Sequence, residues 1–464
     1  MSNPELMRRQ IASILFLLFT FSVHAQNLTI STIQIEGNRV TKENVILREL
    51  PFSVGDSVAA EGLKELKELG VKNLNNSSLF NFVDIKDQIN EEEVKLTVIV
   101  DERWYIWPGI VFSLAETNLN SWLENKDFDR VNYGLYVQHR NFRGRKEKLT
   151  LNFQNGWKRK IGLNYLIPGL NKKRTIGAGI DFFYANNREI NYASSLNKRE
   201  FFKNDRFIQE EVSALAKVEF RPRYYNMHRV ATGMKTVLVD DTVDVYTNEY
   251  LPNGRKRSQA LLLNYGFRRE KRDNVAYPLK GYLVDGTIEQ VGFGLINNND
   301  VQLTHLMATI NTHHQLSDRW FFGHGIKGKT TLLGTPSYYY QRGLGYGSVF
   351  IRGYELDVID GQHYALYKSN VKFQLIKKQV TDLEVMMVDR FDKFHYSIFL
   401  NLFGDAGYVV DNINASINPL ANELQYGYGL GLDFVSYYDI VIRLEGSINR
   451  QGIPAFYIHF KNPI

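Results

Sequence analysis

From Trp104 to the end of the chain, apolar and polar residues alternate with a period of two. For example, Leu149, Leu151 and Phe153 are separated by Thr150 and Asn152. Successive side chains of a strand point to opposite faces, so such a segment predicts a strand with one apolar face. The same pattern recurs in residues 371–375, 398–402, 430–434, 440–445 and 456–460.

Only a few architectures accommodate many strands that each have one apolar face. A soluble β-sandwich or propeller turns the apolar faces inward, whereas a transmembrane barrel turns them toward lipid and keeps a polar lumen. The segments recur about every 20 residues over about 360 residues, which predicts about 16 antiparallel strands. Aromatic residues collect near the strand ends, as a membrane girdle requires, and no blade repeat is evident. We therefore predict a transmembrane antiparallel β-barrel over residues 103–464, with the soluble architectures as the alternative.

The chain begins with the pattern of an export signal. Arg8 and Arg9 precede an apolar run over residues 11–23, and the small residue Ala25 follows it. The run is shorter than the ~20 residues that a membrane-spanning helix needs, which argues against the alternative of a membrane anchor. We predict a signal peptide over residues 1–25. The sequence contains no cysteine, which excludes disulfides, thiol chemistry and lipid attachment through a thiol.

Residues 27–102 differ from the rest because helical periodicity appears among short strands. This order, β-α-α-β-β, predicts a compact α+β domain ahead of the barrel. The expected elements are a strand over 29–35, a helix with Thr41 as its N-cap, a helix over 63–71 ending near Gly70, and strands over 80–85 and 94–100.

Charge and motif content exclude several function classes. The net charge is +6, of which residues 1–25 supply +1 (two arginines, one glutamate), and a balance of +5 is not typical of nucleic-acid binding. The nucleophile-elbow and zinc-protease motifs do not occur. Gly-x-Gly repeats at 343–347 and 427–431 indicate loop flexibility or room in a packed lumen. We expect no enzyme, cofactor, metal or nucleic-acid partner.

Arg352 lies in a Gly- and Tyr-rich loop, around residues 332–365, between two predicted strands. Inside a barrel a guanidinium needs partners, since burying it alone is costly. On the strand over 397–407 the alternation turns Phe403 and Asp405 inward. Arg352 could then bind Asp405 with two hydrogen bonds and stack on Phe403. A solvated arginine at a loop tip is an equal alternative.

Three motifs resemble those of the BamA/TamA family, the bacterial surface-antigen superfamily of outer-membrane assembly proteins. Residues 33–50 resemble the start of that family's periplasmic POTRA domain, and residues 141–144 and 165–168 resemble its early barrel turns. The three motifs are V-R-G-F/Y at Arg352-Gly353-Tyr354, F-x-D-x-G at Phe403-Gly404-Asp405-Ala406-Gly407, and R-D-N-x-x-x-P-x-x-G at Arg272-Asp273-Asn274 with Pro278 and Gly281.

The resemblance implies a 16-stranded outer-membrane barrel whose long loop folds into the lumen and pairs Arg352 with Phe403 and Asp405. It implies a weak seam between the first and last strands, and a periplasmic POTRA domain that binds extended polypeptide by strand addition. The implied partners are unfolded outer-membrane or secreted polypeptides and the lipid bilayer, with accessory lipoproteins or chaperones. No cofactor is implied.

The sequence departs from the family pattern in three places. Only one POTRA-like domain is evident. Inward-facing Lys372 stands where relatives often carry glutamate, so a second acidic partner for Arg352 is not expected. Four residues follow the terminal aromatic Phe460.

These features favour a factor for insertion or translocation of polypeptides. A two-partner secretion pore is a subordinate form of this hypothesis, and it predicts a plug helix for which residues 26–28 leave no room. The alternative hypothesis is an outer-membrane channel or structural barrel without client-folding activity. Its expected signature is ion conductance without acceleration of client folding.

Overall fold

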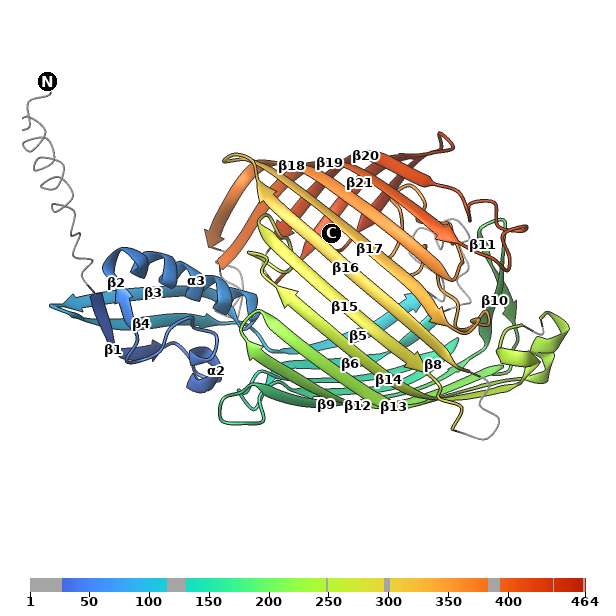
Figure 1. The fold of residues 1–464 in the computed structure, drawn as a ribbon, viewed down its shortest axis with the longest axis horizontal. Coiled ribbons are helices and arrows are strands. Elements are labelled where there is room, and N and C mark those ends of the chain that lie inside the picture. The colour runs from blue at the N-terminus through green and yellow to red at the C-terminus, as the bar shows by residue number, and fades with distance from the viewer. Residues whose placement is uncertain are drawn as a thin grey trace, which may run out of the picture.

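The computed structural model describes residues 27–114, 131–247, 249–295, 301–382, 393–436, 438–461 and 464. The signal-peptide prediction for residues 1–25 lies outside these ranges. The described chain forms a small α+β domain followed by a large antiparallel sheet curved into a barrel (Figure 1). None of its helices is both long and apolar enough to span a membrane.

The N-terminal domain is a four-stranded sheet with strand order β2-β1-β4-β3, in which β1 and β4 are parallel. Leu28, Ile30, Leu96 and Val98 lie on the buried face of the sheet, and Leu74 of α3 packs in the same core. The elements are β1 (Asn27–Glu36), α2 (Glu43–Leu47), β2 (Ser57–Ala59), η1 (Ala60–Gly62), α3 (Leu63–Asn76), β3 (Phe80–Asn90) and β4 (Glu93–Glu102).

Two local predictions in this domain are wrong. The N-cap of α2 is Lys42, and the Thr41 hydroxyl lies 2.9 Å from the Tyr105 hydroxyl and accepts a hydrogen bond from Asn141 Nδ2 at 2.9 Å. Gly70 lies inside α3 rather than at its end. A Cβ on Gly70 would lie 2.9 Å from Ile85 Cδ1, so glycine allows the helix to approach the sheet closely.

The barrel contains 16 antiparallel strands, each paired with the next barrel strand in the chain, which confirms the predicted fold class. A hairpin, β10 (Glu189–Ser195) and β11 (Lys198–Lys203), and two 3-10 turns, η2 (Asp241–Val245) and η3 (Pro252–Gly254), lie in the loops. The barrel strands are β5 (Ile106–Leu114), β6 (Val131–Phe142), β7 (Glu147–Gly156), β8 (Lys158–Ile167), β9 (Ile176–Asn187), β12 (Gln209–Arg223), β13 (Asn226–Val239), β14 (Arg257–Glu270), β15 (Gly281–Val291), β16 (Leu303–Gln315), β17 (Trp320–Leu333), β18 (His363–Asp382), β19 (Lys393–Val410), β20 (Gln425–Ser436), β21 (Val441–Asn449) and β22 (Pro454–His459).

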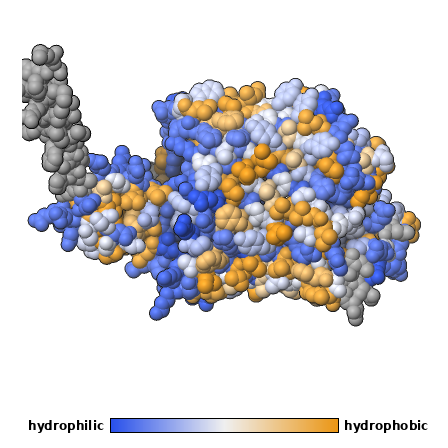
Figure 2. Space-filling view, in the orientation of Figure 1, coloured by the Kyte–Doolittle hydropathy of each residue, from blue (hydrophilic) through white to orange (hydrophobic). Residues whose placement is uncertain are grey.

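The alternation in sequence becomes two chemically distinct faces of the barrel wall. On β19, Leu400 and Leu402 are 44% and 54% exposed on the outside, whereas Asn401 and Phe403 are buried inside. Figure 2 shows apolar side chains gathered over the outer surface of the strands. A lipid-facing surface of this kind is what an outer-membrane barrel presents to the bilayer.

The sheet runs from β5 at one end to β22 at the other. No ladder joins β5 to β22 within the described ranges. The β21–β22 ladder has six residue pairs, whereas the β19–β20 ladder has twelve. Near the end of the chain, Ile464 Cγ2 lies 3.1 Å from the point that a Cβ on Gly325 of β17 would occupy.

The N-terminal domain contacts one end of the barrel, which we name the proximal end; the opposite end is the distal end (Figure 1). Glu49 of this domain is buried at the junction. Its carboxylate accepts hydrogen bonds from both Arg221 Nη atoms, at 3.1 and 3.0 Å, and from Lys146 Nζ at 3.1 Å. At the other side of the junction Arg103 Nη1 lies 2.9 Å from Asp439 Oδ2.

Burial acts to raise the pKa of Glu49, but Lys146 and Arg221 outweigh burial and hold that pKa below the ordinary value of 4.5. A carboxyl group whose pKa is depressed by folding stabilises the folded state above its unfolded pKa. The Glu49 contribution is therefore fully present above pH 4.5 and is lost as the pH falls through the folded pKa.

We predict that Glu49→Gln loosens the junction by about 3–5 kcal/mol, because two cations lose their buried partner. Limited proteolysis between the domain and the barrel measures the effect. Glu43→Gln is the matched control, since Glu43 is exposed in the first turn of α2. Acid should loosen the wild-type junction but change the Glu49→Gln junction little. Equal protection of both variants at neutral pH would contradict the prediction.

Candidate functional site in the barrel lumen

The connection between β17 and β18, residues 334–362, places Arg352 inside the barrel with 0% of the residue exposed to solvent. Ile351 and Tyr354 beside it are also buried. Between them Gly353 has a φ of +97°, a left-handed conformation that favours glycine. The turn at Gly353 therefore allows the loop to enter the lumen and return, and the solvated-arginine alternative does not apply.

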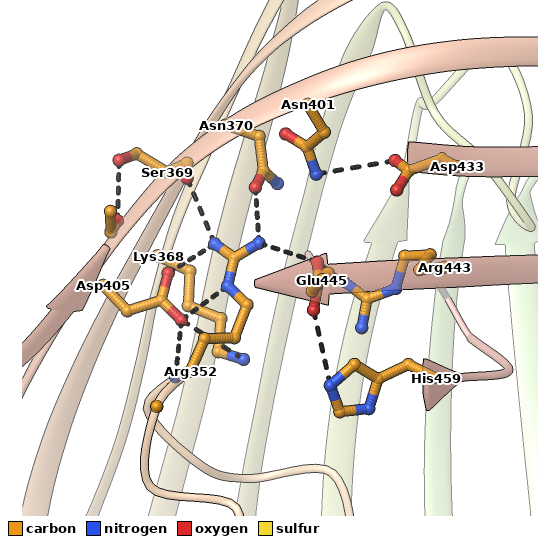
Figure 3. A network of polar contacts seen from close by, with 12 residues as sticks. Arg352, Lys368, Ser369, Asn370, Asn401, Asp405, Asp433, Arg443, Glu445 and His459 are labelled. Atoms are coloured by element: carbon orange, nitrogen blue, oxygen red, sulfur yellow. Dashed lines mark hydrogen bonds and ion pairs between the residues drawn. The ribbon is translucent and has the colours of Figure 1, made fainter. Parts of the chain in front are cut away.

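Arg352 contacts Phe403 and Asp405, the two residues that the alternation turned inward, and Figure 3 shows the contact with Asp405. Its Nε and Nη2 donate to Asp405 Oδ2 and Oδ1 at 2.8 and 2.5 Å, and its backbone N donates to Oδ2 at 3.1 Å. The guanidinium carbon lies 3.9 Å from the centre of the Phe403 ring. The structure thus brings together three residues from two motifs that are about 50 positions apart.

Three further acceptors complete the surroundings of the guanidinium. Nη1 donates to Asn370 Oδ1 at 2.8 Å and lies 3.5 Å from Glu445 Oε1, and Nη2 donates to the Ser369 carbonyl at 3.2 Å. A guanidinium has five N–H donors, so each donor has an acceptor. We name Arg352, Phe403, Asp405, Asn370 and Glu445 the loop anchor.

Glu445 corrects the expectation that Arg352 has no second acidic partner. It lies on β21, where the alternation of 440–445 already turned it inward. It also accepts a hydrogen bond from Arg443 Nη1 at 2.8 Å, and His459 Nε2 lies 3.3 Å from its other oxygen. Lys368 Nζ lies 3.7 Å from Asp405, so the anchor carries excess positive charge on both sides (Figure 3).

Glycines provide the space that the loop needs. A Cβ on Gly407 would lie 2.6 Å from Ile351 Cδ1, and one on Gly427 would lie 1.9 Å from the Arg352 carbonyl oxygen. Residues 427–431 belong to β20, so of the two interpretations of this Gly-x-Gly repeat, room in the lumen is right and loop flexibility is wrong.

The Arg272 motif shapes the connection between β14 and β15 at the proximal end. Arg272 donates twice to Glu270, at 2.7 Å each, and Asp273 Oδ1 accepts from the backbone N–H groups of residues 279 and 280 at 3.0 Å. Asn274 Oδ1 accepts hydrogen bonds from the backbone N–H groups of residues 276 and 277, and Pro278 comes directly after residue 277. Gly281, with a φ of +93°, starts β15. No contact joins Arg272 or Asp273 to Arg352 within the described part of the chain.

This turn inserts Tyr277 into the lumen, and sequence reasoning did not find that residue. The Tyr277 hydroxyl donates to Asp433 Oδ2 at 2.6 Å, and its ring lies 4.9 Å from the Phe399 ring. Inward-facing Lys372 rests on the other side, with Nζ 3.9 Å from the ring centre. We name Tyr277, Lys372, Phe399 and Asp433 the tyrosine anchor. An aromatic residue before Pro278 was the only signal in the sequence.

The N-terminal domain touches the turn that carries Tyr277. Asn76 at the end of α3 donates to the carbonyls of Arg272 and Asp273 at 3.3 and 3.1 Å. The domain, the β14–β15 turn and the strands β18–β20 are therefore in contact in series.

Comparison with known families adds to this geometry. Residues 141–436, more than half of the chain, match the family model described as the Omp85 superfamily domain, and residues 28–103 match the POTRA model described as a surface antigen variable number repeat. The chain belongs to the Omp85 superfamily. No curated protein sequence gives a significant match.

Two bacterial proteins are among the solved structures that resemble this chain. CdiB from Escherichia coli is 10% identical with a TM-score of 0.54, and the alignment covers 93% of this Omp85 chain and 75% of CdiB. BamA from Haemophilus ducreyi lacking POTRA domains 1–3 is 14% identical with a TM-score of 0.49, covering 93% of this chain and 83% of that one. At such identities the CdiB match shows the fold alone.

Omp85 proteins are outer-membrane barrels that insert or translocate polypeptides and are not enzymes, and their POTRA domains bind polypeptide. Within the described residues of this Omp85 chain, no group of three or more His, Cys, Asp or Glu side chains could hold a metal ion.

One segment of this Omp85 chain, residues 323–330 with the sequence GHGIKGKT, matches the spacing of a phosphate-binding loop. Such a loop connects a strand to a helix and leaves its amides free for phosphate. Here the whole segment lies in β17 and pairs with β16 and β18. Its backbone groups serve the sheet, so the spacing does not indicate a nucleotide site.

We predict that Arg352→Ala destabilises the barrel by about 3–5 kcal/mol, because Asp405 and Glu445 lose a buried cation. Urea unfolding in micelles measures the loss, and limited proteolysis within residues 334–362 reports whether the loop leaves the lumen. Arg450→Ala is the control, since its ion pair with Glu423 is exposed and contributes little.

The reversed pair, Arg352→Asp with Asp405→Arg, should not recover stability. The new aspartate would face Glu445, and the new arginine would lie beside Lys368. Recovery by the reversed pair would show that Glu445 and Lys368 do not set the charge balance of the loop anchor.

We also predict that Tyr277→Phe destabilises the barrel by about 1–3 kcal/mol, because the buried Oδ2 of Asp433 loses its short hydrogen bond and keeps only the 3.5 Å bond from Asn401. Thermal unfolding measures the change. Tyr428→Phe is the matched control, since Tyr428 is 52% exposed on the outer face. An equal effect of both substitutions would mean that the hydroxyl of Tyr277 contributes nothing specific.

Proposed function

We propose that this Omp85 protein promotes insertion of unfolded polypeptides into the outer membrane, or their translocation across it. The observation that carries the proposal is the loop anchor, which ties the long loop to β18, β19 and β21, close to β22 at the end of the sheet. An anchored loop holds the lumen in one shape while a client strand pairs at the end of the sheet.

The orientation of the domains forms part of the proposal. We place the N-terminal domain, with its boundary near residue 103, in the periplasm, because an exported chain whose domain precedes the first strand reaches the membrane from that side. Chaperones or accessory lipoproteins would deliver clients there.

A strand edge in the N-terminal domain supports client binding. The order β2-β1-β4-β3 makes β3 an outer strand of eleven residues, whereas β2 at the other edge has only three. β3 exposes Asp84 and every residue from Lys86 to Asn90. An extended polypeptide can add to such an edge through main-chain hydrogen bonds.

A cavity of about 730 Å³ lies where β3 meets the proximal end of the barrel. Phe82 of β3, His395 and Phe399 of β19 and Tyr438 near β21 contribute to its wall. A client strand paired with β3 would pass this cavity before it reached β20–β22. The path is therefore lined by aromatic side chains that can contact apolar residues of a client.

The seam between β5 and β22 supports insertion because β22 is short. A membrane-spanning strand needs about 9–11 residues, and β22 has six. A wall shorter than the bilayer thins the lipid around it, which lowers the barrier to insertion of another strand. No ladder joins β5 to β22 within the described ranges, so a client strand can pair with main-chain groups where these two strands meet.

The second candidate function is a channel without clients, and a distal cavity of about 820 Å³ in the lumen favours it. An experiment separates the two functions. Unfolded outer-membrane protein is added to empty liposomes, to liposomes with the full-length protein, and to liposomes with protein lacking residues 27–102.

We predict that only the full-length protein accelerates client folding severalfold, and that Arg352→Ala reduces this acceleration whereas Arg450→Ala does not. Gel mobility of the folded client gives the rate. Conductance of planar bilayers is recorded in parallel. Conductance without any acceleration would replace the insertion proposal with the channel.

A further inference from the structure

The lumen holds an open cavity, separate from both anchors, at the distal end of the barrel. We name this cavity of about 820 Å³ the distal chamber. Its wall comes from β6–β9 and β12–β17, and loop residues Tyr250, Tyr339 and Tyr340 cover part of it. Cavities of this size hold small organic ligands rather than single ions.

The charged side chains that line the distal chamber carry a net positive charge. Lys235 pairs with Glu211 at 3.2 Å, and Arg342 donates to the carbonyls of residues 338 and 341 at 3.1 and 2.7 Å. Five cations and three carboxylates line the chamber, which gives 5 − 3 = +2; they are Lys158, Lys160, Lys235, Lys329 and Arg342, with Glu189, Glu211 and Glu289.

Three of these lysines have no carboxylate within ion-pair distance in the described part of the chain: Lys158, Lys160 and Lys329. Lys160 Nζ lies 5.2 Å from the centre of the Phe183 ring, and Lys329 Nζ donates to the Arg342 carbonyl at 3.2 Å. Neighbouring cations in a confined space repel each other, and an anion bound between them relieves that repulsion.

The rest of the wall suits a hydroxylated body attached to such an anion. Trp157 Nε1 donates to Glu189 Oε2 at 2.7 Å, which fixes its indole at the wall. Tyr339 packs edge-on against Tyr250, with ring centres 5.7 Å apart. Gln154 and Asn132 add amide groups, which can donate to and accept from hydroxyls. Flat rings, amides and excess cations together favour an acidic sugar over an apolar anion.

We propose that the distal chamber binds a sugar that carries a phosphate or a carboxylate. The oxyanion lies beside Lys158 and Lys160, two inward-facing residues of β8, and the sugar ring packs on the aromatic wall. Tyr339 and Tyr340 belong to the same loop as Arg352, so the occupied chamber holds the loop at a point distant from the loop anchor. The proposal does not depend on whether the protein inserts polypeptides.

The test is a titration of the full-length protein in detergent, with calorimetry and intrinsic tryptophan fluorescence as readouts; Trp157 is the tryptophan that lines the chamber. The probes are glucose 6-phosphate, glucuronate, inorganic phosphate and glucose. We expect glucose 6-phosphate and glucuronate to bind, phosphate to bind more weakly, and glucose not to bind. A phosphorylated glycolipid in vesicles forms a separate arm, and saturation by it of the same site would identify a lipid-borne source.

Lys158→Gln combined with Lys160→Gln should weaken binding of glucose 6-phosphate by at least roughly tenfold, because two charged hydrogen-bond donors are lost. Lys256→Gln is the control, since Lys256 pairs with Asp244 in a distal loop outside the chamber. Gel mobility of the heated and unheated barrel confirms that each variant is folded.

Three outcomes would overturn the proposal. These are no binding of either acidic sugar at millimolar concentration, equal affinity for glucose and glucose 6-phosphate, and equal affinity for phosphate and glucose 6-phosphate. Unchanged binding in the folded double-lysine variant would equally exclude the chamber as the site.

Discussion

The guanidinium of Arg352 has no access to water, so all five of its N–H groups must find acceptors inside the protein. Two of these acceptors belong to Asp405 on β19. The other three belong to Ser369 and Asn370 on β18 and to Glu445 on β21. Because burial of an unpaired charge is so unfavourable, the loop can lie in the lumen only when these strands keep their relative stagger. Placing the loop in the lumen also explains the glycines of β20, because the loop backbone occupies the space that side chains at those positions would fill.

The tyrosine anchor extends this dependence to the proximal end. Tyr277 reaches Asp433 from a turn that Asn76 of the N-terminal domain also contacts. Glu49 holds the same domain to Arg221 and Lys146, and Arg103 holds it to Asp439 between β20 and β21. The domain that we propose to bind clients is thus held by polar contacts at two sides of the barrel rim, and one of the contacted turns reaches strands close to the seam.

Much of this arrangement could be predicted from the sequence, because a period of two determines which side of a strand a residue faces. That period placed Phe403, Asp405 and Lys372 inside the barrel. It could not show that Glu445 lies beside Arg352. That contact depends on how β21 is staggered against the strands that hold the loop, and the two residues are 93 positions apart. Tyr277 was missed because the direction of a turn depends on tertiary contacts. Thr41 and Gly70 were misassigned because packing outweighed the local preference for a cap or a helix end.

The acceptors of Arg352 lie 18, 53 and 93 positions further along the chain. The loop therefore cannot be fully seated when β18 and β19 form, because its last acceptor belongs to the second-to-last strand. Until β21 arrives, one guanidinium donor lacks its partner and the loop remains exchangeable with water. Loop insertion is then a late step of folding that reports the completion of the barrel wall, and long-range closure of this kind is expected to be slow.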